Sequence, residues 1–150
     1  MREIIVDTNI IFSCLLNSQS NIGDLIFNSD EVFEFYSNDY MRLEIHKHWE
    51  KLKKISKLTD TELETAFEKL LTKLTFINEA LIPSEIWLKA EQLVADIDID
   101  DLDFVALTKY IKGSLWTGDK ELYNGLKQKR FRSVYNTADI LKLRNRLTLK

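Results

Sequence analysis

Short apolar runs alternate with longer amphipathic segments along this chain. Residues 3–6 (Glu-Ile-Ile-Val) form a β-branched run that is typical of a buried strand. Further strand-like runs are expected at residues 32–36, 76–77, 114–117 and 133–135. Between these runs, apolar residues recur at helical spacing over residues 10–16, 22–27, 85–94, 102–111 and 120–128, and a basic helix follows Asn136-Thr137. Alternating strands and helices predict an α/β fold with a central parallel sheet and helices on both faces.

The middle of the chain departs from this alternation. Apolar residues at helical spacing predict one helix through Met41, Ile45, Trp49, Leu52 and Ile55 and a second through Leu63, Phe67, Leu70, Leu71 and Leu74. Thr59 and Glu62 fit the capping box that starts a helix. We therefore expect a helical hairpin beside the sheet. Since the chain contains no linker or repeat, residues 1–150 are predicted to form a single domain.

Composition indicates which class of protein and which compartment to expect. The 150 residues are 45% hydrophobic and 30% charged, with no apolar run of 18 residues, so no membrane span is expected. The only cysteine, Cys14, lies in an apolar stretch and is expected to be buried. One cysteine cannot form a disulfide within the chain, which fits a reducing compartment. Without a signal peptide, a cytoplasmic location is expected.

Charge is distributed unevenly. Residues 120–150 hold nine lysines and arginines but only two acidic residues, whereas the whole chain has a net charge of −3. A basic C-terminal part beside an acidic centre is compatible with a bound polyanion. A solvated lysine-rich surface explains the same charges equally well.

The densest acidic segment lies at residues 96–103. Five aspartates fall within these eight residues, with no lysine or arginine among them. Carboxylates this close repel one another, and Mg²⁺ prefers oxygen ligands of this kind. The alternative is a solvated acidic loop that caps the following helix.

Other acidic residues are expected to meet this segment. Asp7 follows the first strand and Asp119 follows a later one, so both should lie at the carboxyl edge of a parallel sheet. Asp101 begins a helix at that edge, and Glu44 borders the apolar stripe of its helix. The topology thus predicts one pocket with four acidic residues, although Asp7 alone could simply cap the next helix.

These segments together resemble the PIN domain, a family of metal-dependent nucleases. The matching residues are Ile4-Ile5-Val6-Asp7-Thr8-Asn9, Arg42-Leu43-Glu44-Ile45, Asp101-Leu102-Asp103-Phe104-Val105-Ala106-Leu107 and Leu115-Trp116-Thr117-Gly118-Asp119-Lys120-Glu121-Leu122. The resemblance covers nearly the whole chain and implies a three-layer α/β/α fold. It assigns the catalytic, metal-binding positions to Asp7, Glu44, Asp101 and Asp119. Asn9, Thr117, Asp100 and Asp103 are expected to support them, whereas Asp98 and Asp103 could also be simply solvated.

The resemblance also implies a function. It predicts an endoribonuclease that uses Mg²⁺ or Mn²⁺ to hydrolyse RNA phosphodiester bonds. Family members include toxins of type II toxin–antitoxin pairs, which implies a small antitoxin protein as a partner, and family habit suggests a homodimer. The basic residues expected to contact RNA are Lys127, Lys129, Arg130, Arg132, Arg144 and Arg146.

Two other functions remain open from sequence. One is a different Mg²⁺-dependent doubly wound phosphotransfer protein, although an aspartyl phosphatase would want an acid where Asn9 stands. The other is a non-catalytic RNA-binding or regulatory module. A nucleotide-binding enzyme is disfavoured because no glycine-rich loop follows the first strand.

Overall fold

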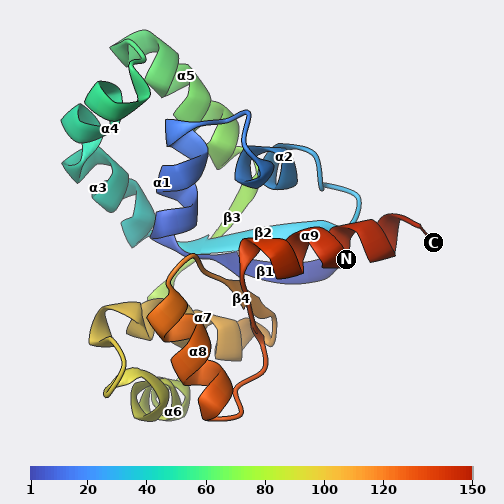
Figure 1. Cartoon of the computed structure of the whole chain (residues 1–150). Coiled ribbons are helices and arrows are strands. Elements are labelled where there is room, and N and C mark those ends of the chain that lie inside the picture. The colour runs from blue at the N-terminus through green and yellow to red at the C-terminus, as the bar shows by residue number, and fades with distance from the viewer. Residues whose placement is uncertain (150) are drawn as a thin grey trace.

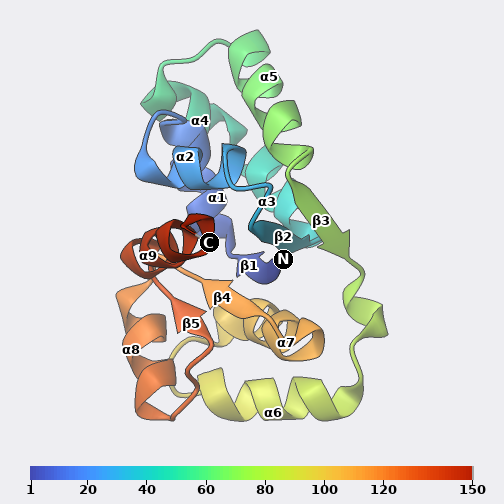
Figure 2. The ribbon, with the colours of Figure 1, turned by 90° about the vertical axis from the view of Figure 1, so that its right-hand side faces the viewer.

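The centre of the fold is a five-stranded parallel sheet, seen in a computed structural model that describes residues 1–149. Its strand order is β3-β2-β1-β4-β5 (Figures 1 and 2). The strands are β1 Arg2–Val6, β2 Phe33–Asn38, β3 Leu74–Ile77, β4 Ser114–Trp116 and β5 Val134–Tyr135. All four neighbouring pairs run parallel, so the predicted α/β fold is confirmed.

Helices cover both faces of the sheet (Figure 1). They are α1 Thr8–Leu16, α2 Asn21–Phe27, α3 Tyr40–Lys47, α4 Trp49–Ser56, α5 Asp60–Leu71, α6 Ser84–Val94, α7 Leu102–Ile111, α8 Lys120–Gln128 and α9 Thr137–Thr148. Two short 3-10 helices, Glu79–Leu81 and Ile99–Asp101, precede α6 and α7. Within residues 1–149, no helix combines the length and the hydrophobicity needed to cross a membrane.

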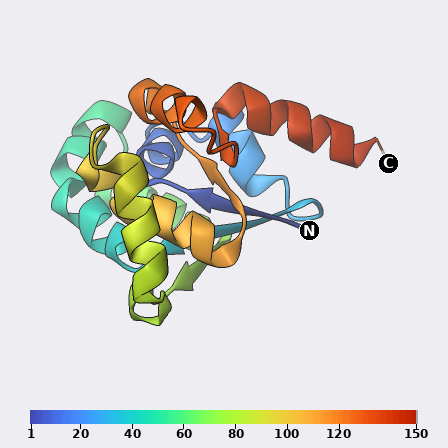
Figure 3. The same cartoon turned by 90° about the horizontal axis from the view of Figure 1, so that it is seen from below.

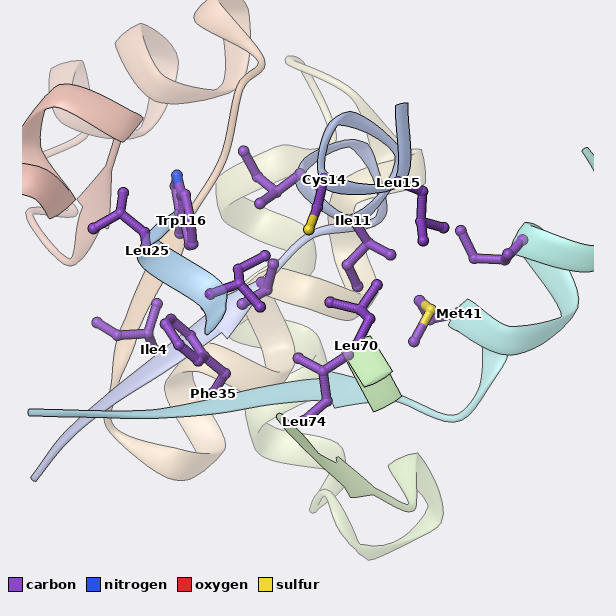
Figure 4. Close-up of a cluster of buried hydrophobic side chains, with 14 of the residues drawn as sticks. Ile4, Ile11, Cys14, Leu15, Leu25, Phe35, Met41, Leu70, Leu74 and Trp116 are labelled. Atoms are coloured by element: carbon purple, nitrogen blue, oxygen red, sulfur yellow. The ribbon is translucent and has the colours of Figure 1, made fainter. Parts of the chain in front are cut away.

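Two hydrophobic cores hold the three layers together. The first joins β1 and β2 to helices α1–α5 and α9, and it includes Phe35, Trp116 and the buried Cys14 (Figure 4). The second joins the other face of the sheet to α6, α7 and α8, around Leu107 and Leu115. Helices α6, α7 and α8 lie together on one side of the sheet (Figure 1), and in the view from that side α9 extends away from them (Figure 3). The predicted three-layer α/β/α arrangement is therefore confirmed.

The parallel sheet brings distant parts of the chain to one edge. Val6 ends β1 directly beside Trp116, which ends β4. The amide of Asp7 continues this pairing by donating to the Trp116 carbonyl oxygen at 3.3 Å. The segments that follow β1 and β4 therefore leave the sheet side by side. The start of β1 and the end of α9 lie at the opposite edge, where the strands begin (Figure 1).

The helical hairpin differs from its prediction. The single helix expected through Met41–Ile55 is two helices, α3 and α4, which meet at His48. The His48 amide donates to both the Glu44 and the Ile45 carbonyl oxygens, and its backbone leaves the helical region. Both helices can then pack against α1, and Ile55 is 54% exposed instead of facing the core. Leu74, expected on the second helix, begins β3.

The left-handed residue that ends α7 is Lys112, with φ of 62°, and not the Gly113 that follows it, although glycine adopts this conformation most easily. Gly113 is needed for another reason. A Cβ atom there would lie 2.6 Å from the backbone oxygen of Glu3, so only glycine lets α7 return this close to β1.

Candidate metal centre

Asp7 is the most buried acidic residue of the site. It follows β1 directly and caps α1, since its Oδ1 accepts a hydrogen bond from the Ile10 amide at 3.0 Å. Its side chain is only 3% exposed. Within residues 1–149, the second oxygen, Oδ2, is buried and has no hydrogen-bond partner. A buried carboxylate oxygen without a partner is costly, which points to a missing ligand.

Asp119 is held at the same edge by the next helix. Its Oδ1 accepts hydrogen bonds from the amides of Glu121 at 2.9 Å and Leu122 at 3.3 Å, so it caps α8. The Thr117 hydroxyl accepts from the Asp119 amide at 3.1 Å and fixes the turn between β4 and α8. Oδ1 is therefore held by the first turn of α8, and Asp119 lines the acidic cavity described below.

The third contribution comes from the turn before α7. Asp98 caps this 3-10 turn by accepting from the Asp100 amide at 3.0 Å. Asp101 follows at the start of α7, but its side chain makes no capping bond, and its Oδ2 is buried without a partner among the described residues. One carboxylate oxygen each from Asp98, Asp101 and Asp119 lies within 4.8 Å of the other two.

A single cavity of about 630 Å³ connects these groups. It is lined by all four acids predicted from sequence, which are Asp7, Glu44, Asp101 and Asp119. Asn9, Asp98, Asp100 and Asp103 also line it. Glu44 and Asn9 are exposed at its border, and Thr117 is buried behind it. The four acids that sequence placed at one site therefore share one cavity, and Thr117 does not line it.

The cavity favours protonated carboxyl groups when no cation is present. Burial raises the pKa of Asp7 from 3.8 to about 6, and the charge of Asp119 adds to this effect. Burial likewise raises the pKa of Asp101 to about 7, with further contributions from Asp98 and Asp119. A carboxyl group with such a pKa is easily neutralised by a proton or by a bound cation.

The donor set fits a hard divalent cation. All close donors are carboxylate oxygens, the ligands that Mg²⁺ and Mn²⁺ take in proteins. The orphaned oxygens of Asp7 and Asp101 are a second reason to expect a cation here, because a cation would supply the partner that each oxygen lacks. Asp98, Asp101 and Asp119 lie closest together, and Asp7 lies deepest.

The sequence reasoning left the role of one acidic residue of the cavity open and did not consider a half-buried acidic residue outside the cavity. Asp98 was expected to support the ligands or face solvent, yet its carboxylate lies among the three closest. Glu79 was not considered, although burial raises its pKa to about 7, helped by the charges of Asp103 and Asp39. Asp98 could have been found because it precedes the helix by one short turn. Glu79 could not, since its place depends on how β3 leads into α6.

The basic residues proposed for RNA lie away from the acidic cavity. Arg130 and Arg132 lie between α8 and the start of β5, at the opposite edge of the sheet. Lys129 pairs with Asp96, and Arg144 Nη2 lies 2.7 Å from Asp24 Oδ2, so both already have acidic partners. Lys127 and Arg146 line a cavity of about 310 Å³ with residues of β5 and α9, including Lys142 and Asp139.

Fold and site together define a doubly wound α/β protein with a carboxylate centre at the carboxyl edge of its sheet. The family model of the PIN domain matches residues 5–139, and the chain belongs to this family. The resemblance seen in the sequence is thereby confirmed. A search of curated proteins gives no match.

Twelve chains of solved structures match this chain. One of them belongs to the crystal structure of VapBC2 from Rickettsia felis bound to a promoter DNA fragment, with a TM-score of 0.63. The similarity covers 89% of this chain and 98% of that one, at 14% sequence identity. At this identity the likeness shows a shared fold.

Proposed function

We propose that this protein is a metal-dependent endoribonuclease that hydrolyses RNA phosphodiester bonds. The observation that supports this most is the convergence of Asp98, Asp101 and Asp119 within 4.8 Å in a PIN-family chain, beside the orphaned oxygen of Asp7. Asp7, Glu44, Asp101 and Asp119 are the proposed catalytic and metal-binding residues, and we now add Asp98. Mg²⁺ or Mn²⁺ bound there would lower the pKa of a water molecule and offset charge on the phosphodiester.

The protein's own groups are proposed to keep these carboxylates in position. The Ile10 amide orients Asp7, the first-turn amides of α8 orient Asp119, and the Thr117 hydroxyl fixes the approach to α8. Asn9 is exposed at the border of the cavity, where its amide would donate to the substrate. Asp100 and Asp103 line the same cavity and would add negative charge that favours cation binding.

The biological role proposed is that of a toxin held in check by a small antitoxin protein. The support is the fold shared with a structure of VapBC2, together with the complete set of acidic residues. A homodimer and a cytoplasmic location remain predictions. If the toxin role is correct, expression of the chain alone should arrest bacterial growth, and Asp119→Asn should abolish the arrest.

A non-catalytic RNA-binding module is the second candidate. The basic cavity around Lys127 and Arg146 favours it, since this cavity would bind a polyanion whether or not the acids act. Phosphotransfer on Asp7 has less support, because Asp7 is almost fully buried and its Oδ1 is engaged by the Ile10 amide.

The experiment is cleavage of a structured RNA pool by protein freed of copurified partners. Wild-type protein should cut RNA with Mn²⁺ or Mg²⁺ and stop in EDTA. Asp119→Asn should lower the rate by about 10²-fold or more, as expected for loss of a dominant electrostatic contribution. Asp96→Asn is the matched control, because Asp96 belongs to the same acidic segment but pairs with Lys129 outside the cavity. Cleavage that ignores EDTA and Asp119→Asn would contradict the proposal.

A further inference from the structure

A second cavity of about 660 Å³ lies beside the acidic one. Asn9 lines both cavities, and Gly118, next to Asp119, lines the second one as well. We call this second space the side cavity. It lies between α1, α2 and α4 and opens next to the proposed metal centre. One part of an extended molecule bound in the acidic cavity would therefore be followed by a part that lies at the side cavity.

The wall of the side cavity offers aromatic and apolar surface. The rings of Phe12 and His48 meet edge to face, with centroids 5.6 Å apart, and both residues are half-buried. Leu16 and Ile22 continue the apolar wall. Single-stranded RNA bases bind to proteins by packing against phenylalanine and histidine rings in this kind of setting.

Polar groups around the same wall suit a nucleotide. Ser13 and Asn9 present a hydroxyl and an amide, and Lys51 presents a cation at the exposed border. Within residues 1–149, none of these three side chains is engaged in a hydrogen bond or an ion pair. This wall matches a base and its phosphate better than a purely apolar ligand. The apolar surface suits the base, the free polar groups can pair with the base edge, and the nearby cation suits the phosphate.

We propose that the side cavity binds one unpaired nucleobase of the RNA strand, next to the phosphodiester held at the acidic cavity. The proposal rests on the proposed ribonuclease function and extends it to substrate selection. Phe12 and His48 pack against the base, Ser13 contacts its edge, and Lys51 contacts the adjoining phosphate. Only an unpaired nucleotide can place its base there, so the protein should cut single-stranded segments or loops.

The test first measures binding without cleavage. Asp119→Asn protein is titrated with a single-stranded RNA of mixed sequence and with an RNA of the same length whose residues lack bases. Loss of the bases should weaken binding by about 5-fold or more. Adding Phe12→Leu or His48→Ala should shrink this difference, because each removes aromatic surface. Phe131→Leu is the matched control, since Phe131 is a half-buried phenylalanine in a different cavity.

The second part uses the catalytically active protein. Phe12→Leu should change which nucleotides flank the positions of Mn²⁺-dependent cleavage, whereas Phe131→Leu should leave both the rate and the cut positions unchanged. If cleavage continues with unchanged positions and the binding difference survives both substitutions, the base site is refuted and the nuclease stands. If wild type cuts no RNA, the nuclease proposal fails, and the binding titration alone decides the base site. The inference would also be overturned if Phe12→Leu and His48→Ala left RNA binding unchanged and weakened only the binding of a protein partner.

Discussion

Asp7 shows how much one buried residue can reveal. Its position after a buried strand was enough to predict its place at the carboxyl edge of the sheet. Sequence could not show that one oxygen caps α1 while the other is left without a partner, since that depends on how α1 and β4 close over it. The same holds for Asp98, whose place in the site depends on the 3-10 turn before α7.

Asp7→Asn should stabilise the metal-free protein at neutral pH. The pKa of Asp7 is raised to about 6, so the folded state binds its proton more tightly than the unfolded state does. Its contribution to stability is fully present below pH 4 and is lost as pH rises through about 6. Asparagine keeps the acceptor for the Ile10 amide and removes the buried charge. The expected gain at pH 7.5 is about 1–3 kcal/mol.

Urea unfolding in EDTA at pH 5 and at pH 7.5 measures this effect. The wild-type protein should lose stability between the two pH values, and Asp7→Asn should lose less. Asp100→Asn, an exposed residue of the same cavity, serves as the control. Equal pH dependence in wild type and Asp7→Asn would show that the Asp7 carboxyl is not destabilised by burial.

At the scale of elements, the positions of strands and helices followed from the apolar pattern, while only those ends that depend on local sequence could be predicted. The capping box at Thr59 and the start of α9 at Asn136 were predicted correctly because both are local. The break between α3 and α4 was not predictable, because the apolar stripe continues through it. It arises from packing of both helices against α1, a contact far away in sequence.

The end of α7 supplies a matched pair of substitutions. Lys112→Gly should stabilise the fold by about 1 kcal/mol, because glycine adopts the left-handed conformation without the Cβ penalty. Gly113→Ala should destabilise it by about 1–3 kcal/mol, because the new methyl group meets the Glu3 carbonyl oxygen. Denaturant unfolding compares both with wild type. A stabilising Gly113→Ala would show that α7 can move away from β1.

At the scale of the whole molecule, parallel topology explains why residues from four separate segments share one cavity. The rule that strands end at one edge made Asp7, Asp101 and Asp119 predictable as a group. No such rule applies to the basic residues, since their excess in residues 120–150 is spread over α8, the α8–β5 connection and α9. Net charge was therefore compatible with either a polyanion ligand or a solvated surface, and it could not tell free cations from paired ones.

RNA binding should distinguish the basic residues that line the cavity between α8 and α9 from those that already pair with acidic residues. Replacing Lys127, Lys142 and Arg146 together with glutamine should weaken binding of RNA to Asp119→Asn protein. It should also reduce the slope of log affinity against log salt by about 2 for single-stranded RNA. Replacing Lys129 and Arg144, which already pair with Asp96 and Asp24, should change the slope less. Equal effects of the two sets would remove the α8–α9 surface from the RNA path.

The most direct test of the metal centre is a calorimetric titration of Mn²⁺ into the partner-free protein at pH 7. Wild type should bind Mn²⁺ saturably and unfold at a higher temperature with Mn²⁺ than in EDTA. Asp101→Asn and Asp98→Asn should each weaken binding by at least about 10-fold, whereas Asp96→Asn should bind as wild type does. Absence of Mn²⁺ binding in wild type, or equal binding by all three variants, would contradict a metal centre formed by these carboxylates.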